Sequence, residues 1–380
     1  MASAFVSYHA CYNISYSLAK DIHYLSKLKL PKFNIRGNGS TSAVTKIRAS
    51  TVSTVPHVIE NVDMDLKQTR QNIPTTKQFV DPHRQGSIIE NGVRYRQLVV
   101  IRSYEVGPDK TATLESILNL LQETALNHVW MSGLLGDGFG ATHGMVRNDL
   151  MWVVSRLQLQ VEDYPIWGEV LQLDTWVGAS GKNGMRRDWE LRSQATGVVF
   201  ARATSNGATL SSTWVMMNKR TRRLSKMPDE VRAELSPWFI EKQAIMEDTP
   251  EKMKKLDDTA KHGTSSLKAK RSDLDMNHHV NNVKYVGWML ETMPDEFMEQ
   301  YQLCNIILEY RKECGSSDIV QSLSEPDEEN RTTDESLRSL NGMQIKYTHL
   351  LQTKGEVKNE EIVRGRTTWR KKHSKMPFPM

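Results

Sequence analysis

The densest run of chemically capable side chains is the polar segment 272–282, which holds two aspartates, two histidines and three asparagines. Within it, Asp275, Asn277 and His279 alternate along the chain, so in an extended segment their side chains project to one side. An acid, an amide and an imidazole are the types that orient a water, polarise a carbonyl group and move a proton. A helix is predicted directly after the segment, and its N-terminal N–H groups could stabilise a developing oxyanion. These three residues are therefore candidate catalytic residues.

A second candidate pair, Glu313 and Cys314, follows a predicted strand at 305–311. Cys314 could be a nucleophile activated by His279. Alternatively, Glu313 could activate a water as general base while Cys314 packs as a small buried residue. The spacing of these residues leaves both schemes open.

Metal and phosphate sites are less well supported by the sequence. The acids and amide of segment 272–282 resemble the first ligands of an EF-hand calcium loop, but that loop needs glycine and glutamate where this chain has His278 and Lys284. Two adjacent histidines rarely bind one ion without further ligands at suitable spacing. The glycine run at 136–140 lacks the Lys-Ser/Thr pair of a phosphate loop. We therefore expect no metal and no cofactor; for the polar segment itself, simple helix capping is the structural alternative.

Two helices must position these groups, and the apolar spacing predicts both. A helix over 114–127 carries its apolar stripe at i, i+3, i+4 and i+7, and a second helix begins near 283 and stops at Pro294. Each helix follows a short strand and precedes several strands. The first of these in the amino-terminal half spans 150–160, and apolar and polar residues alternate over 157–162. One unit thus appears twice, about 170 residues apart. This pattern predicts an α+β fold in which an antiparallel sheet wraps round a helix, two times over.

Composition limits the broad class of the protein. The chain has 380 residues, 38% of them hydrophobic and 25% charged, which is typical of a globular protein of about two domains at ~150 residues each. No run of about 18 apolar residues occurs, so no transmembrane segment is predicted. Three cysteines are too few for a disulfide framework and indicate a reducing compartment.

The positive charge belongs to the amino terminus. Residues 1–50 hold seven basic residues and one acid, which leaves 43 basic and 44 acidic residues in the remainder. Serine-rich, acid-poor composition without a long apolar core is typical of an organelle transit peptide, so we interpret residues 1–50 as one. Residues 51–92 are interpreted as a flexible linker. The nearly neutral body gives no reason to expect nucleic-acid binding.

Basic residues in the body form local clusters that could bind an acidic protein. The most prominent members are Arg186 and Arg187 in one cluster and Arg222 and Arg223 in another. The alternative interpretation is that these charges solvate and protect the edges of strands.

Several longer motifs together resemble those of the plant acyl–acyl-carrier-protein (acyl-ACP) thioesterases. They are Arg102–Gly107, Leu121–His128, Gly181–Trp189, Trp214–Asn218, Asp273–Trp288 and Leu308–Cys314, within a similarity that runs from about Tyr95 to Trp369. The resemblance implies a tandem hot-dog fold, two antiparallel sheets each wrapped round a central helix, with an acyl-chain pocket in an amino-terminal domain at 93–260. It also implies a catalytic carboxy-terminal domain at 261–375, a plastid stromal location and an acidic carrier as partner.

The resemblance also implies roles for the candidate residues. The family's catalytic set maps onto Asp275, Asn277, His279, Glu313 and Cys314. We favour a scheme in which Glu313 and His279 prepare a water, Asn277 and backbone amides hold the thioester carbonyl, and Asp275 orients the set.

The motifs are closer to the saturated-acyl branch of the family, which favours palmitate or other long saturated chains, with oleate kept open. Two departures from the family pattern stand out. His278 takes the place of the usual glutamine, and residues 206–211 look like an insertion in a family strand.

Two other functions compete with thioester hydrolysis. A hot-dog 3-hydroxyacyl-ACP dehydratase would also use a histidine and an acid but would leave the thioester intact. A non-catalytic acyl-binding module would keep the pocket without turnover. The oligomeric state, including a homodimer, stays open.

Overall fold

The computed structural model describes residues 86–89, 92–136, 140–205, 214–246, 253–276, 278–327, 344–355 and 359–372. The predicted transit peptide, the apparent insertion at 206–211 and the candidate residue Asn277 lie outside the described residues. So does most of the expected linker. The end of the expected linker is not a flexible segment, because Gly86–Ile89 form strand β1, which pairs with β2 (Arg94–Val100).

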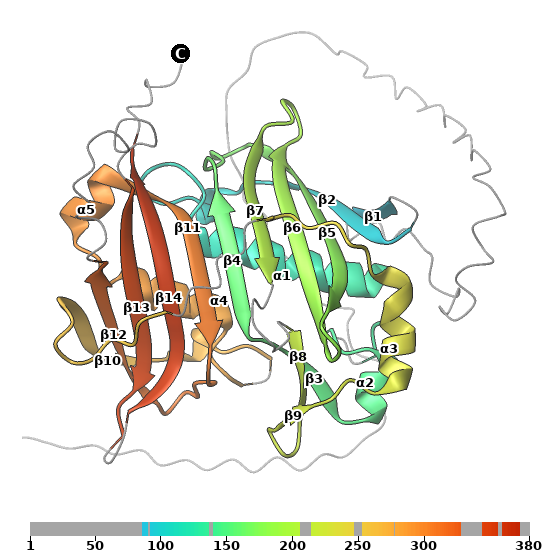
Figure 1. The fold of residues 1–380 in the computed structure, drawn as a ribbon. Helices are drawn as coiled ribbons and strands as arrows, with labels where there is room; N and C mark the ends of the chain where they lie inside the picture. Colours follow the sequence, from blue (N-terminus) through green and yellow to red (C-terminus); the bar gives the residue numbers. More distant parts are fainter. Residues whose placement is uncertain are drawn as a thin grey trace, which may run out of the picture. The chain divides into compact units, whose positions relative to one another are not determined.

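One antiparallel sheet runs through the described part of the chain (Figure 1). Its main path is β1, β2, β5 (Val170–Ser180), β6 (Gly184–Ser193), β7 (Val199–Ser205), β4 (Arg156–Val161), β11 (Tyr301–Tyr310), β14 (Glu360–Lys371), β13 (Ile345–Thr353), β12 (Ile319–Pro326) and β10 (His262–Lys268). The amino-terminal and carboxy-terminal halves join where β4 pairs with β11, from Gln160–Asn305 to Arg156–Glu309. The two predicted sheets are therefore continuous.

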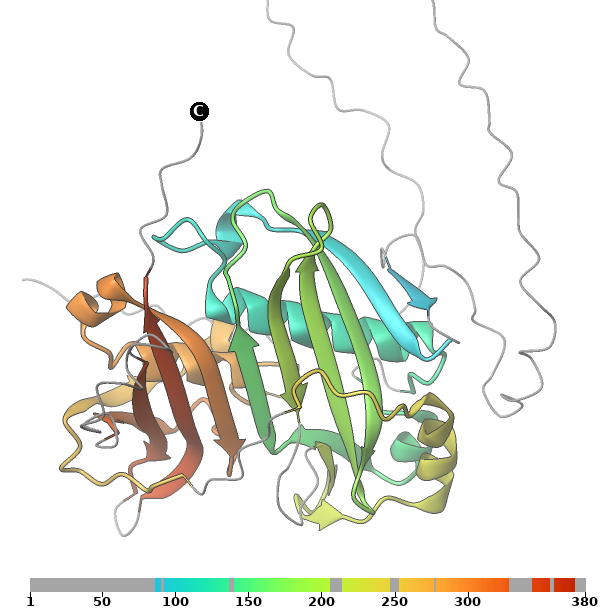
Figure 2. The same cartoon turned by 45° about the horizontal axis from the view of Figure 1, so that its top comes forward.

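The first predicted helix is α1 (Leu114–Met131), which crosses one face of the amino-terminal half of the sheet (Figures 1 and 2). Thr113 caps it, because its hydroxyl accepts a hydrogen bond from the backbone N–H of Ser116 at 3.1 Å. The apolar stripe predicted from the sequence is buried. The indole N–H of Trp189 on β6 donates to the carbonyl of Leu121 at 3.0 Å and so fixes the helix on the sheet.

The second predicted helix is α4 (Asn282–Leu290). Asn281 caps it by accepting a hydrogen bond from the N–H of Val283 at 3.1 Å. The helix packs against α1 at Gly287, where any side chain would meet the carboxylate of Glu115. The Glu115 carboxylate thus occupies the space that the missing side chain leaves between the central helices of the two halves.

The strand predicted over 150–160 is divided at Ser155. Its first part, β3 (Leu150–Val154), leaves the main sheet and pairs with β8 (Trp214–Asn218), which in turn pairs with β9 (Leu224–Ser225). Its second part, β4, stays between β7 and β11. Two short helices, α2 (His143–Arg147) and α3 (Asp229–Leu235), pack together beside these strands, and α5 (Asp295–Gln300) follows α4.

A single cluster of buried apolar side chains spans both halves. It includes Leu121 of α1, Leu159 of β4, Val286 of α4 and Trp369 of β14. The two halves thus share one hydrophobic core. Among the described residues, no helix is both long and apolar enough to cross a membrane.

Candidate active site

In the polar segment before α4, two hydrogen bonds join Asp275 and His279. The N–H of Asp275 donates to the carbonyl of His279 at 2.7 Å, and the N–H of His279 donates to the Asp275 carboxylate at 3.2 Å. His278 occupies the left-handed backbone region, with φ of 63°, which reverses the chain between them. Asp275 is thus the residue that holds the position of His279.

The segment that follows β11 brings Glu313 to this loop. The N–H of Val280 donates to the carbonyl of Cys314 at 3.0 Å, which ties the two segments together. The Nε2 atom of His279 lies 3.6 Å from the nearer carboxylate oxygen of Glu313. This separation is slightly too long for a direct hydrogen bond, and a water lying beside the pair could bond to both groups.

A third charged group reaches the site from the amino-terminal half. Arg222 lies in the turn between β8 and β9, where its N–H donates to the carbonyl of Asn218 at 2.9 Å and its φ is 55°. Its guanidinium forms an ion pair with Glu313. The sequence shows Arg222 only as a member of a basic cluster, because nothing in local spacing indicates a partner 91 residues away.

The electrostatic environment keeps His279 neutral. Partial burial lowers the pKa of its imidazole, and the positive charge of Arg222 lowers it further, with Asp275 opposing in part. A neutral imidazole beside a carboxylate can accept or relay a proton, as general acid–base chemistry requires.

Cys314 has a different environment. The residue is fully buried, and burial raises the pKa of its thiol to about 12, with the charge of Asp318 adding to the shift. Its N–H donates to the hydroxyl of Tyr285 on α4 at 3.2 Å. Only the thiolate is a strong nucleophile, so this geometry favours a packing role for Cys314.

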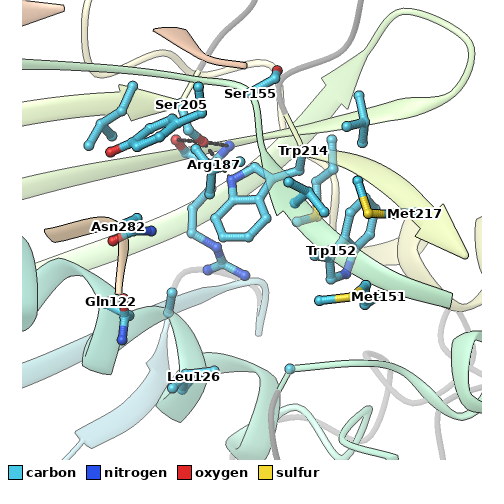
Figure 3. Close-up of a pocket in the computed structure, with 18 of the residues that line it drawn as sticks. Gln122, Leu126, Met151, Trp152, Ser155, Arg187, Ser205, Trp214, Met217 and Asn282 are labelled. Carbon is cyan, nitrogen blue, oxygen red and sulfur yellow. Dashed lines mark hydrogen bonds between the residues drawn. The ribbon is translucent and has the colours of Figure 1, made fainter. Parts of the chain in front are cut away.

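A cavity of about 620 Å³ adjoins the loop and runs along α1, which contributes Gln122 and Leu126 to its wall (Figure 3). This volume is in the usual range for small-molecule sites, about 300–1,000 Å³. The side of α1 that carries Leu118 and Leu121 forms one wall, and Met151–Val154 of β3 form another. Polar residues of the carboxy-terminal half also line it, namely Asp275, His279, Asn281, Asn282 and Glu313.

The structure thus brings together three of the five predicted site residues, Asp275, His279 and Glu313. Cys314 lies next to them but does not line the cavity. Asn281, which caps α4, and Asp273, whose carboxylate accepts from the N–H of Lys270 at 2.8 Å, fit the capping alternative for their positions.

The predicted docking cluster needs a correction. Arg186 and Arg187 are buried, with exposures of 6% and 4%, and so cannot meet a docking protein. The Nε of Arg186 donates to Asp188 at 2.6 Å inside the protein. Arg223 is exposed, and Arg222 is held by Glu313.

No three His, Cys, Asp or Glu side chains of the described ranges are grouped so that they could hold a metal ion. The site has a carboxylate, an imidazole and a helix N-terminus at one end of a largely apolar cavity. Such a site can hydrolyse an ester or thioester of a long apolar group.

Comparison with known proteins identifies relatives with such substrates. Residues 92–235 match the family model "Acyl-ACP thioesterase N-terminal domain", and residues 256–371 match "Acyl-ACP thioesterase C-terminal domain". The palmitoyl-acyl carrier protein thioesterase of Gossypium hirsutum, a chloroplastic protein, is 48% identical over 297 residues, which cover 78% of this chain and 68% of that protein. The chloroplastic dodecanoyl-[acyl-carrier-protein] hydrolase of Umbellularia californica is 43% identical over 300 residues, 79% of this chain and 72% of that protein.

The structural comparison agrees. The solved 12:0-ACP thioesterase from Umbellularia californica superposes with a TM-score of 0.65 at 42% identity and covers 74% of this chain and 95% of that chain. The expected α+β tandem hot-dog fold is confirmed.

Proposed function

This chain belongs to the acyl-ACP thioesterase family, and from that membership we propose that it hydrolyses the thioester of long-chain acyl-ACP, releasing a free fatty acid and ending its synthesis on the carrier. One observation carries the proposal. A neutral imidazole, His279, and a carboxylate, Glu313, lie 3.6 Å apart at the wall of an apolar cavity, beside the N-terminus of α4.

We propose the following steps. Glu313 takes a proton from a water that also contacts His279, and the water oxygen attacks the thioester carbonyl carbon. Negative charge then grows on the carbonyl oxygen, where the N-terminal N–H groups of α4 and Asn277 stabilise it. The carbon–sulfur bond breaks, the pantetheine sulfur leaves, and the proton is returned to it through His279. Asp275 orients the imidazole, and Cys314 takes no covalent part.

The two halves divide the work in this proposal. The amino-terminal half, 93–260, supplies most of the cavity wall and so holds the acyl chain, whereas 261–375 supplies the reacting groups. Palmitate and other long saturated chains are the favoured substrates, because the Gossypium relative is named for palmitoyl-ACP. The Umbellularia relative is named for a dodecanoyl substrate, so chain length must be measured on this protein.

We also propose that the protein acts in the plastid stroma, after removal of a transit peptide at 1–50. The named relatives are chloroplastic. An acidic carrier would meet exposed cations beside the cavity. Lys219 and Lys312 line the cavity, and Arg223 is close to Lys219 in the sequence.

The test offers the purified protein a panel of acyl-ACP substrates with chains of 8 to about 18 carbons and measures both free thiol and free fatty acid. Equal release of the two products from long chains supports hydrolysis. Release of an enoyl product with the thioester intact would instead indicate a dehydratase. No release from any chain would contradict the proposal.

A further inference from the structure

The cavity contains a buried cation that the proposed hydrolysis does not use. Along β6, Met185, Arg187 and Trp189 alternate onto the face that lines the cavity, while Arg186 and Asp188 point to the other face and pair with each other. Arg187 is 4% exposed. In Figure 3 its side chain extends from the strand into the pocket, beside Trp214 and toward Leu126 of α1.

No described carboxylate forms an ion pair with Arg187. Its two side-chain hydrogen bonds in the described part of the chain both use Nη1, one with His128 Nδ1 at 3.0 Å and one to the Thr175 hydroxyl at 3.3 Å. The Nε and Nη2 atoms have no partner among the described residues, which leaves them free for a group inside the cavity.

The partner ring of Arg187 carries no compensating charge. His128 is buried beneath Tyr95 and Trp238, and its ring also bonds the backbone of Val93. Burial lowers the pKa of His128 well below its usual value, and the charge of Arg187 lowers it further. The neutral ring therefore accepts a hydrogen bond but cannot balance the guanidinium. Burial also lowers the pKa of Arg187, to about 9, although the charge of the adjacent Asp188, which is paired with Arg186, opposes this shift in part. Arg187 therefore stays mostly charged at neutral pH.

Arg187 is separated from the proposed reacting groups by the width of several strands. The path across the sheet runs from Arg187–Ser205 through Thr204–Gln158 to Leu157–Leu308. Three steps of about 4.8 Å place β6 roughly 14 Å from β11, whose continuation carries Glu313. The cavity thus has polar groups on two sides, with apolar walls between them.

An unpaired buried charge is costly, and a ligand that neutralises it gains correspondingly. The apolar walls suit an alkyl chain, and a planar carboxylate matches the guanidinium. We propose that Arg187 is a binding site for a carboxylate carried on an alkyl chain within the cavity. Such a carboxylate could belong to a free fatty acid bound with its head group at Arg187 rather than at His279, or to the far end of a dicarboxylic acyl chain.

This inference rests on the proposed function in one respect, namely that the ligand in the cavity carries an alkyl chain. Binding is measured without turnover, so its failure is distinguishable from a failure of hydrolysis. The probes are decanoate and 1-decanol, which share an alkyl chain, titrated into the protein at neutral pH by calorimetry. We expect decanoate to bind at least about tenfold more tightly, as a charged hydrogen-bonded pair in a dry site allows.

Two substitutions locate the carboxylate. Arg187→Met should remove the preference for decanoate, and Arg187→Lys should keep part of it, with thermal unfolding used to check that both variants fold. Lys219→Met is the matched control, because it removes a cation from the cavity wall at an exposed position. It should leave the preference intact.

The opposite pattern, a preference lost in Lys219→Met and kept in Arg187→Met, would place the head group elsewhere and overturn the proposal. Equal affinity of the wild-type protein for the two probes would overturn it even if no Arg187 variant folds. The two sources are separated by comparing decanoyl-ACP with its ω-carboxyl analogue. If the wild type hydrolyses the analogue faster than decanoyl-ACP, and Arg187→Met does not, the site binds a dicarboxylic chain. If the analogue is not hydrolysed faster but decanoate inhibits competitively, the site binds a free fatty acid.

Discussion

Glu313 and Cys314 are adjacent in the sequence, yet their surroundings suit them to different tasks. Glu313 lines the cavity and faces His279, whereas Cys314 points away into the core. A thiol with a pKa of about 12 is ionised in roughly one molecule in ten thousand at pH 8. The carboxylate is therefore the better candidate for activating the nucleophile.

Substitution of these two residues tests that assignment. We expect Glu313→Gln to lower kcat by about 10²–10⁴-fold, because it removes a general base while keeping the size of the side chain. Cys314→Ala should retain much of the wild-type activity. Steady-state kinetics on palmitoyl-ACP, with circular dichroism to verify folding, measures both. A folded but inactive Cys314→Ala together with an active Glu313→Gln would reverse the assignment.

Arg222 is predicted to position Glu313 and to set the pH range of the reaction. Its charge lowers the pKa of His279, so Arg222→Met should raise that pKa and move the acidic limb of the kcat profile to higher pH. A fall in kcat of about tenfold should accompany the shift, because Glu313 loses its ion-pair partner.

The neighbouring Arg223→Met is the control for Arg222, since Arg223 is exposed and forms no ion pair with the described residues. Arg222→Lys should restore part of the activity and of the wild-type profile. An unchanged pH profile in Arg222→Met would show that the arginine has only a structural role.

The sequence predicted which candidate residues lie together better than it predicted the solvent exposure of the basic residues. The polar segment 272–282 could be identified because its residue types are unusual together, and its neighbour at 313–314 follows from the strand that ends there. The basic pair at 186–187 was interpreted as a surface cluster and is buried, because its partners, Asp188, His128 and two backbone carbonyls, come together only in the fold. The charge of an arginine in the sequence does not show whether it will be buried with hydrogen-bonding partners or exposed to solvent.

At the scale of secondary structure, local patterns predicted the central helices well. Their stripes of apolar residues match the faces that pack on the sheet, and their capping residues are those that cap helices in general. The division of 150–160 into β3 and β4 was not predicted, because the apolar run at 150–154 and the alternating residues from Leu157 onward both have strand character. The division depends on the pairing of β3 with β8, whose residues lie 60 to 68 positions further along the chain.

Gly178 on β5 lets the segment after α3, which includes Ile240, pack closely against the strand. A Cβ atom there would lie 2.7 Å from the carbonyl oxygen of Ile240 and 2.6 Å from the guanidinium of Arg186. Gly178→Ala should therefore destabilise the protein by about 1–3 kcal/mol, as overpacking usually does. Urea unfolding measures the change.

Gly315→Ala is the matched control for Gly178, because the nearest atom to its Cβ would be 3.9 Å away. A change within about 0.5 kcal/mol is expected there. Similar losses in both variants would mean that loss of glycine itself, rather than crowding by Ile240, is responsible.

At the scale of the molecule, the β4–β11 pairing and the shared core make the two halves one folding unit. Leu159 is fully buried and lies opposite Ile306 in this pairing. We expect Leu159→Ala to cost about 2–5 kcal/mol and to weaken both halves equally. Hydrogen exchange of peptides from β5–β6 and from β13–β14 should accelerate by the same factor, whereas faster exchange in one half alone would show independent units.

The position of β3 in the cavity wall has a practical consequence for protein engineering. Met151–Val154 line the cavity but belong to a strand outside the main path of the sheet. The proposed reacting groups come from the other half of the chain. A library confined to those four positions could alter which chain lengths are admitted while the rate of bond cleavage stays nearly constant. Selectivity and turnover would then be adjustable by separate sets of mutations.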